Sequence, residues 1–216
     1  MRIVAWPAPG GDELAMTAGP DEAARRILIV PALFEEANRT RRMWAEAMRA
    51  MAAAGVFAAL PDLPGCNESL APLEQQTLAT WRTAMEAAAS HFAATHALSL
   101  RGGVLVAPAA LPGWRVEPIA GAQALRPMLR ARTLAAREDG RSETIEGLLE
   151  LGRREGLELA GYRLGAALVA ELAEAEPEPS EQASVALTEL GGAALWLRSE
   201  PGEDPALSAA LARLVA

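Results

Sequence analysis

Lysine is absent from this chain of 216 residues, so all 20 basic residues are arginine. Together with the many alanines, that bias is typical of codon usage in a GC-rich genome. The 28 acidic residues outnumber the arginines and give a formal net charge of −8. Because nucleic acids are polyanions, this charge argues against a general nucleic-acid binder.

Cysteine and long apolar runs are also scarce. The single cysteine, Cys66, excludes an internal disulfide framework. No run of 18 apolar residues occurs, and the segment Met1–Pro7 lacks the hydrophobic region of a signal peptide. We therefore expect no membrane span, no export and a cytoplasmic location.

Motifs for common cofactors are missing as well. The sequence has no histidine and cysteine cluster with metal-ligand spacing, no Walker loop and no dinucleotide-binding glycine fingerprint. It therefore gives no support for a metal, a nucleoside triphosphate or NAD, and we predict no cofactor.

The most informative stretch that is present runs from Ile27 to Met43. The apolar burst Ile27–Val30 predicts a buried strand, and a helical pattern follows over about residues 39–54. A second apolar strand is expected at residues 56–60. A strand, a crossover helix and a parallel strand make the βαβ unit of an open α/β sheet.

Apolar periodicity and turn residues outline the remaining elements. We expect further strands at residues 2–6, 13–17, 97–100, 115–119 and 193–197, and helices over residues 73–94, 104–110 and 205–215. Three helical patterns occupy residues 122–175, and an acidic linker follows at residues 174–181. The sequence thus predicts a single α/β domain with a mostly parallel central sheet, helices on both faces and a helical cap, residues 122–175, inserted after the sixth strand.

The segment after the first buried strand resembles a known family. It carries Pro31, Phe34, Glu35, Glu36, Asn38, Arg41, Arg42 and Met43, and the next strand is followed by Asp62, Leu63 and Gly65. This pattern is similar to that of the exosortase A system-associated hydrolase 2 proteins, and looser similarity extends over roughly residues 25–175. The resemblance implies an α/β-hydrolase fold and a bacterial protein that works beside protein-sorting and exopolysaccharide machinery.

At the turn where such a fold carries its nucleophile, this sequence departs from the motif of active hydrolases. Active α/β-hydrolases carry Gly-x-Ser-x-Gly at a strand-to-helix elbow and a histidine later in the chain. The matching segment here is Ser99-Leu100-Arg101-Gly102-Gly103, with arginine at the position of the nucleophile. Both histidines, His91 and His96, precede this turn, so we expect them at the opposite edge of the sheet. The protein therefore lacks the Ser-His-Asp pattern.

Six residues are candidates for ligand binding, namely Glu35, Glu36, Asn38, Arg101, Arg126 and Arg130. The two glutamates lie in the loop where hydrolases bind an oxyanion, and Asn38, Arg41 and Arg42 are possible partners for them. Arg126 and Arg130 share one helical face of the cap, and together with Arg101 they would hold a small anionic ligand. Where no anion is bound, we expect Arg101 to form an ion pair with Glu35, Glu36 or another acidic side chain. Cys66 is interpreted as a structural thiol and Ser69 as a turn residue.

Two functions from different classes remain open. In the first, the protein is a degenerate α/β-hydrolase, or pseudoenzyme, that binds a ligand or a protein partner in an exosortase or exopolysaccharide system. In the second, it is an active hydrolase of an ester or a related bond in which Glu35 or Glu36 activates water. The sequence favours the first, because both the serine and the later histidine are missing.

Overall fold

Seven strands form the central sheet of the computed structural model, which describes residues 1–216. In their order across the sheet the strands are β1 (Arg2–Ala8), β2 (Gly11–Ala18), β4 (Phe57–Pro61), β3 (Arg26–Val30), β5 (His96–Leu100), β6 (Gly113–Val116) and β9 (Ala183–Val185). β1 and β2 form an antiparallel hairpin, and β2 is antiparallel to β4. The other five strands are parallel to one another, which confirms the predicted mostly parallel sheet.

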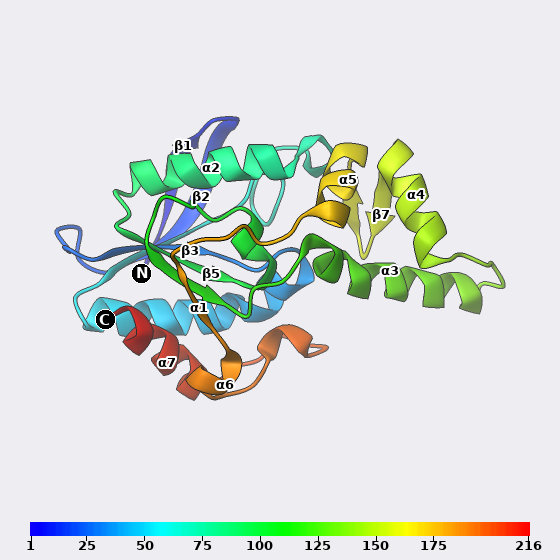
Figure 1. The fold of residues 1–216 in the computed structure, drawn as a ribbon. Helices are drawn as coiled ribbons and strands as arrows, with labels where there is room; N and C mark the ends of the chain where they lie inside the picture. The colour runs from blue at the N-terminus through cyan, green and yellow to red at the C-terminus, as the bar shows by residue number, and fades with distance from the viewer.

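Helices cover both faces of this sheet (Figure 1). The helices and 3₁₀ turns of this part are α1 (Glu35–Ala53), η1 (Leu73–Gln75), α2 (Leu78–His91), η2 (Arg101–Leu105), α6 (Leu187–Leu190), η3 (Leu195–Leu197) and α7 (Pro205–Val215). α2 lies on one face, and α1 and α7 lie on the other. The predicted helix of residues 205–215 is confirmed.

Strand β3 shows why the central strands are continuous apolar runs. Successive side chains of a strand point to opposite faces of the sheet. Leu28 and Val30 accordingly join the hydrophobic cluster that contains Trp81 of α2, whereas Ile27 and Ile29 join the cluster of α1 and α7. Because both faces are covered by helices, every position of the strand after Arg26 is buried.

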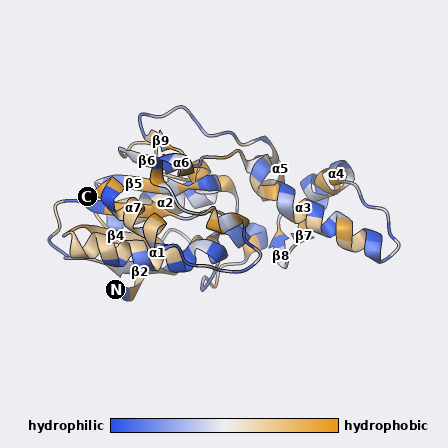
Figure 2. Ribbon diagram, turned by 90° about the horizontal axis from the view of Figure 1, so that it is seen from below, coloured by the Kyte–Doolittle hydropathy of each residue, from blue (hydrophilic) through white to orange (hydrophobic).

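The chain between β6 and β9 forms the helical cap. It consists of α3 (Gly121–Glu138), α4 (Ile145–Glu155), an antiparallel hairpin of β7 (Leu157–Leu159) and β8 (Tyr162–Leu164), and α5 (Ala166–Glu174). Figure 2 shows these elements together at one side of the sheet. A helical cap after the sixth strand agrees with the prediction, whereas the helical patterns do not predict the small hairpin.

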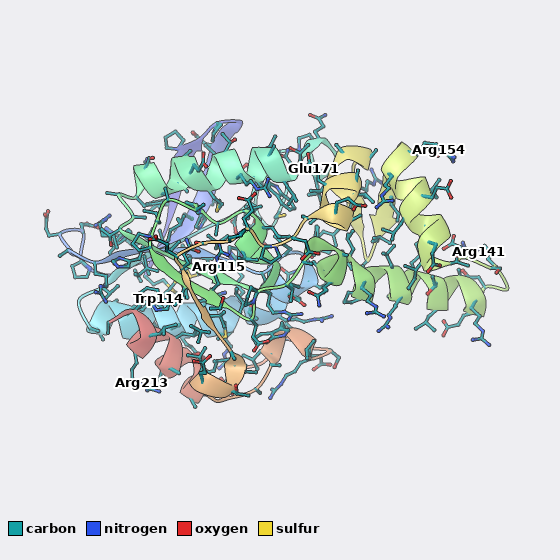
Figure 3. The ribbon with its side chains drawn as sticks, viewed as in Figure 1. Trp114, Arg115, Arg141, Arg154, Glu171 and Arg213 are labelled. Carbon is teal, nitrogen blue, oxygen red and sulfur yellow. The ribbon has the colours of Figure 1, made fainter.

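Two close contacts join the cap to η1 and to the start of α2. Glu171 of α5, labelled in Figure 3, accepts a hydrogen bond of 2.5 Å from the backbone N–H of Leu78. A carboxylate at this position satisfies a free N–H and opposes the positive end of the helix. Nearby, Gly165 packs so closely on η1 that a Cβ atom would lie 2.1 Å from the carbonyl oxygen of Glu74. Only glycine permits this approach.

The prediction of a last strand at residues 193–197 is wrong. This segment contains η3, and its Leu195 and Trp196 are buried in the cluster of α7. The last strand is instead β9, which follows the acidic linker, pairs only with β6 and buries only Val185. A short edge strand with one buried side chain has no apolar pattern that marks it.

The turn after β5 also differs from the prediction. The short helix expected at residues 104–110 is replaced by the 3₁₀ turn η2, which begins at Arg101. None of the helices combines the length and the apolar character that crossing a membrane requires.

Candidate functional site

Arg101 stands at the carboxyl end of β5 in a backbone conformation that non-glycine residues rarely adopt. Its φ is 55°, a left-handed value that costs about 1–2 kcal/mol for an L-residue. Gly103 follows so close to the preceding loop that a Cβ atom would lie 2.2 Å from the carbonyl oxygen of Pro31. The turn therefore has the sharp, strained geometry described for a hydrolase nucleophile elbow, with a guanidinium in the position of the nucleophile.

The guanidinium of Arg101 forms an ion pair with Glu36 in the first turn of α1. Nε donates to Oε2 at 3.1 Å and one terminal nitrogen donates to Oε1 at 3.0 Å. The side chains are only 15% and 13% exposed, respectively. The guanidinium carbon also lies 5.4 Å from the ring centroid of Trp196, whose carbonyl oxygen accepts a hydrogen bond from Arg39. The prediction that Arg101 pairs with an acidic side chain is confirmed.

Glu35 contacts the cap instead of an arginine. Its Oε1 accepts a hydrogen bond of 3.2 Å from the hydroxyl of Tyr162 on β8, and that hydroxyl accepts a bond of 3.1 Å from Nδ2 of Asn38. Burial and the charge of Glu35 raise the pKa of Tyr162, so its hydroxyl remains protonated at neutral pH. The structure thus links Glu35 and Asn38 through a residue of the cap.

Sequence reasoning did not identify Tyr162 as a site residue. The available signal was that it is the only tyrosine of the chain, placed between two short apolar segments of the cap. The β7–β8 hairpin brings Tyr162 beside Glu35, although the two residues are 127 positions apart in the sequence.

Arg41 and Arg42 do not pair with Glu35 or Glu36, contrary to the interpretation of the loop. Arg41 contacts Asp62 at 3.2 Å, and Arg42 contacts Glu46 and Glu203. Asp62 also accepts a bond of 2.7 Å from Nδ2 of Asn67. Because these arginines contact other carboxylates, the two glutamates are held by Arg101 and Tyr162 instead. Both glutamates lie in the first turn of α1 and not in the loop where they were predicted.

Cys66 and Ser69 have the structural roles expected of them. Burial, followed by the charges of Asp62 and Glu13, raises the pKa of the Cys66 thiol to about 12, so the reactive thiolate is nearly absent at neutral pH. The hydroxyl of Ser69 donates to Glu13 at 2.7 Å and accepts from the backbone N–H of Gly65 at 2.8 Å. Ser69 therefore fastens the loop after β4, as predicted for a turn residue.

A small cavity opens between this loop, the start of α1 and the cap hairpin. Its volume is about 180 Å³, and it is lined by Pro31, Ala32, Phe34, Ala37, Asn38, Leu63, Cys66, Asn67 and Tyr162. The rings of Phe34 and Tyr162 meet edge to face with centroids 5.4 Å apart. Most of the lining is apolar, and the polar side chains of Asn38 and Asn67 are exposed at its mouth.

The two histidines lie at the opposite edge of the sheet, as predicted. His96 begins β5, where its Nδ1 lies 2.9 Å from the hydroxyl oxygen of Thr95. Its ring stacks on Trp114, labelled in Figure 3, with centroids 5.6 Å apart. Burial and the charge of Arg25 lower the pKa of His96. His91 is exposed at the end of α2, so neither imidazole can serve as a base for the elbow.

Arg126 and Arg130 are not brought together with Arg101. Both are exposed on α3 and neither forms an ion pair. Arg126 lines a different cavity, which it shares with Ile145 and Leu149 of α4. The expected convergence of three guanidiniums is therefore wrong for this structure, because α3 turns this face away from the elbow. No group of three or more histidine, cysteine, aspartate or glutamate side chains is arranged to hold a metal ion.

Comparison with solved structures identifies the architecture. Est1E from Butyrivibrio proteoclasticus, solved with ferulic acid bound, is 15% identical over 85% of this chain and 88% of its own, with a TM-score of 0.55. The fold is that of the α/β-hydrolases. This α/β-hydrolase fold accounts for the strand order, the cap after β6 and the elbow after β5.

Other similarities to hydrolases are weaker. A putative hydrolase from Agrobacterium vitis S4 is 16% identical over 79% of this chain and 70% of its own, with a TM-score of 0.48. Epoxide hydrolase VrEH1 from Vigna radiata is 14% identical over 53% of this chain, with a TM-score of 0.43, and the chain spans 39% of its length. No protein-family model matches the sequence, and the search of curated proteins finds no matching relative.

Proposed function

We propose that this protein is an α/β-hydrolase-like binding protein without Ser-His-Asp catalysis, associated with a bacterial exosortase or exopolysaccharide system. The observation that supports the absence of catalysis is the ion pair of Arg101 and Glu36, which occupies the elbow. The association with exosortases rests on the sequence resemblance of the segment from Pro31 to Met43, and the cytoplasmic location stays a prediction.

The chemistry of the pair disfavours acyl transfer at this elbow. A guanidinium stays protonated and has no lone pair with which to attack a carbonyl carbon. Glu36 fills the space beside it with negative charge, where a hydrolase would stabilise an oxyanion. With both histidines at the opposite edge of the sheet, no imidazole is available to activate a serine.

The proposed partner is a small ligand or a protein of the same system. An anionic ligand at the elbow would have to displace Glu36 from Arg101, because the two contacts already occupy the fork of the guanidinium. Arg126 and Arg130 remain free on α3 for a protein partner with acidic groups.

An esterase panel tests the proposal. We expect hydrolysis of p-nitrophenyl acetate and butyrate at the background rate and no stoichiometric labelling by a fluorophosphonate. The Arg101→Ser variant should stay equally inactive, since a hydroxyl without a base is a poor nucleophile. Turnover well above background, or specific labelling at Ser69 or Ser99, contradicts the proposal.

Glu35 supports the alternative of an unconventional hydrolase. Its carboxylate has no arginine partner and lies beside the cavity through Tyr162, so it is better placed than Glu36 to activate water. This alternative predicts ester turnover that Glu35→Gln abolishes and that Glu150→Gln, at an exposed position of α4, leaves unchanged.

A further inference from the structure

The cavity between the start of α1, the loop after β4 and the cap hairpin has an apolar interior and a polar mouth. Pro31, Ala32, Phe34 and Leu63 are buried and form the interior, whereas Asn38 and Asn67 are exposed at the mouth. Its volume of about 180 Å³ suits one ring or a short branched alkyl group. Pockets of this kind bind an apolar body and orient it through a few polar groups.

Hydrogen bonding fixes which atoms the two amides offer to a ligand. A carboxylate has no proton to donate, so Asn67 must turn its Nδ2 toward Asp62. Tyr162 must donate its hydroxyl proton to Glu35, and it therefore accepts from Nδ2 of Asn38. Each Nδ2 donates one hydrogen bond to the protein and keeps a second N–H, and neither carbonyl oxygen has a hydrogen-bond partner. The mouth therefore offers two free carbonyl acceptors beside two N–H donors, so the amides accommodate a ligand and the charges decide its sign.

The charges around the mouth add a preference for a cation. Asp62 is compensated by Arg41 and Glu36 by Arg101, but Glu35 has no arginine partner. The thiol of Cys66 and the hydroxyl of Tyr162 stay protonated and contribute no charge. Glu35 and Glu36 also oppose the positive end of α1, which would otherwise attract an anion.

We propose that this cavity binds a small organic ammonium ion, with its apolar body between Phe34 and Leu63 and its N–H groups directed at the carbonyl oxygens of Asn38 and Asn67. The ammonium group stays near solvent at the mouth, so its desolvation is small. This inference deepens the proposed binding function and rests on it.

Three probes of similar shape test the charge preference. Benzylamine, benzyl alcohol and benzoate are titrated at neutral pH and followed by protein NMR shifts. We expect benzylamine to bind roughly 3- to 10-fold more tightly than benzyl alcohol, because the charge of Glu35 attracts the ammonium group through partly solvated space. Benzoate should bind most weakly, because the same charge repels it. Equal affinities, tighter binding of benzoate or no binding of benzylamine overturns the inference.

Matched variants locate the site. Glu35→Gln should remove most of the advantage of benzylamine over benzyl alcohol, whereas Glu150→Gln removes the same charge at an exposed position of α4 that does not line the cavity and should keep that advantage. Ala37→Phe, on the partly exposed wall of the cavity, should abolish binding of both compounds. Unchanged benzylamine binding in Ala37→Phe or Glu35→Gln contradicts the assignment.

The esterase panel separates this inference from the proposed function. If the protein hydrolyses esters and also prefers benzylamine, the non-catalytic function is contradicted but the ammonium site is supported. If ester hydrolysis stays at background and benzylamine is not preferred, the ammonium site is contradicted but the non-catalytic function is supported.

Discussion

The guanidinium of Arg101 meets the carboxylate of Glu36 in two contacts of 3.1 and 3.0 Å while the backbone of Arg101 is held at a φ of 55°. The same residue thus supplies a favourable ion pair and an unfavourable backbone conformation. Substitutions at position 101 can separate these two contributions to stability.

Arg101→Ala should lower the free energy of unfolding by about 2 kcal/mol, less than for a fully buried pair because both side chains keep some exposure. Arg101→Gly should be about 1 kcal/mol more stable than Arg101→Ala, since glycine adopts the left-handed conformation without strain. Arg101→Lys keeps the charge but loses the fork, so its stability should lie between that of wild type and Arg101→Ala. Urea denaturation measures all three.

Arg130→Ala is the control, because Arg130 is exposed and unpaired, and it should change stability by less than about 0.5 kcal/mol. If Arg101→Ala is as stable as this control, the pair contributes nothing to the fold.

Gly103→Ala should destabilise the protein by about 3 kcal/mol or more, because the added Cβ would lie 2.2 Å from the backbone oxygen of Pro31. Gly10→Ala, in the turn between β1 and β2, meets nothing within 4 Å and should be nearly neutral. Thermal unfolding of the two variants makes the comparison. Similar melting temperatures would mean that the loop after β3 can move to accommodate the added Cβ atom at little energetic cost.

Cys66 should react slowly in the folded protein. With a pKa of about 12, its thiolate fraction at pH 8 falls far below that of an ordinary thiol. After allowance for the greater nucleophilicity of a more basic thiolate, labelling by 5,5′-dithiobis(2-nitrobenzoate) should be about 100-fold slower than in urea. Rapid labelling of the native protein would show that the thiol lies in a different environment.

Glu13 should make the protein relatively more stable as the pH falls from 7 toward 5. Its side chain is buried, and burial raises the pKa of its carboxyl despite the hydrogen bond from Ser69. Because the folded state then binds a proton more readily than the unfolded state, protonation between the two pKa values favours folding.

The comparison with Glu13→Gln isolates this residue from the other carboxylates. The stability of wild type minus that of the variant, measured by urea denaturation at pH 7, 6 and 5, should increase toward pH 5. If this stability difference stays constant or decreases toward pH 5, burial does not raise the pKa of Glu13.

Local patterns were sufficient to predict much of this molecule. The run Ile27–Val30 is apolar at every position because both faces of its strand are covered, and the helix of residues 205–215 has a matching apolar face. The elbow at Arg101 and the distant histidines followed from chain order alone, because parallel strands place all their carboxyl ends at one edge.

Tertiary structure decided the features that depend on packing between distant segments. The apolar residues 193–197 form a buried 3₁₀ turn against α7, and the short edge strand β9 takes the place expected for them in the sheet. Arg101 selects Glu36 over Glu35 because helix α1 turns adjacent side chains in different directions. Glu35 meets Tyr162 only because the cap hairpin returns to the start of α1. Periodicity records which side of an element is buried, but the partner on that side is fixed only when the elements pack.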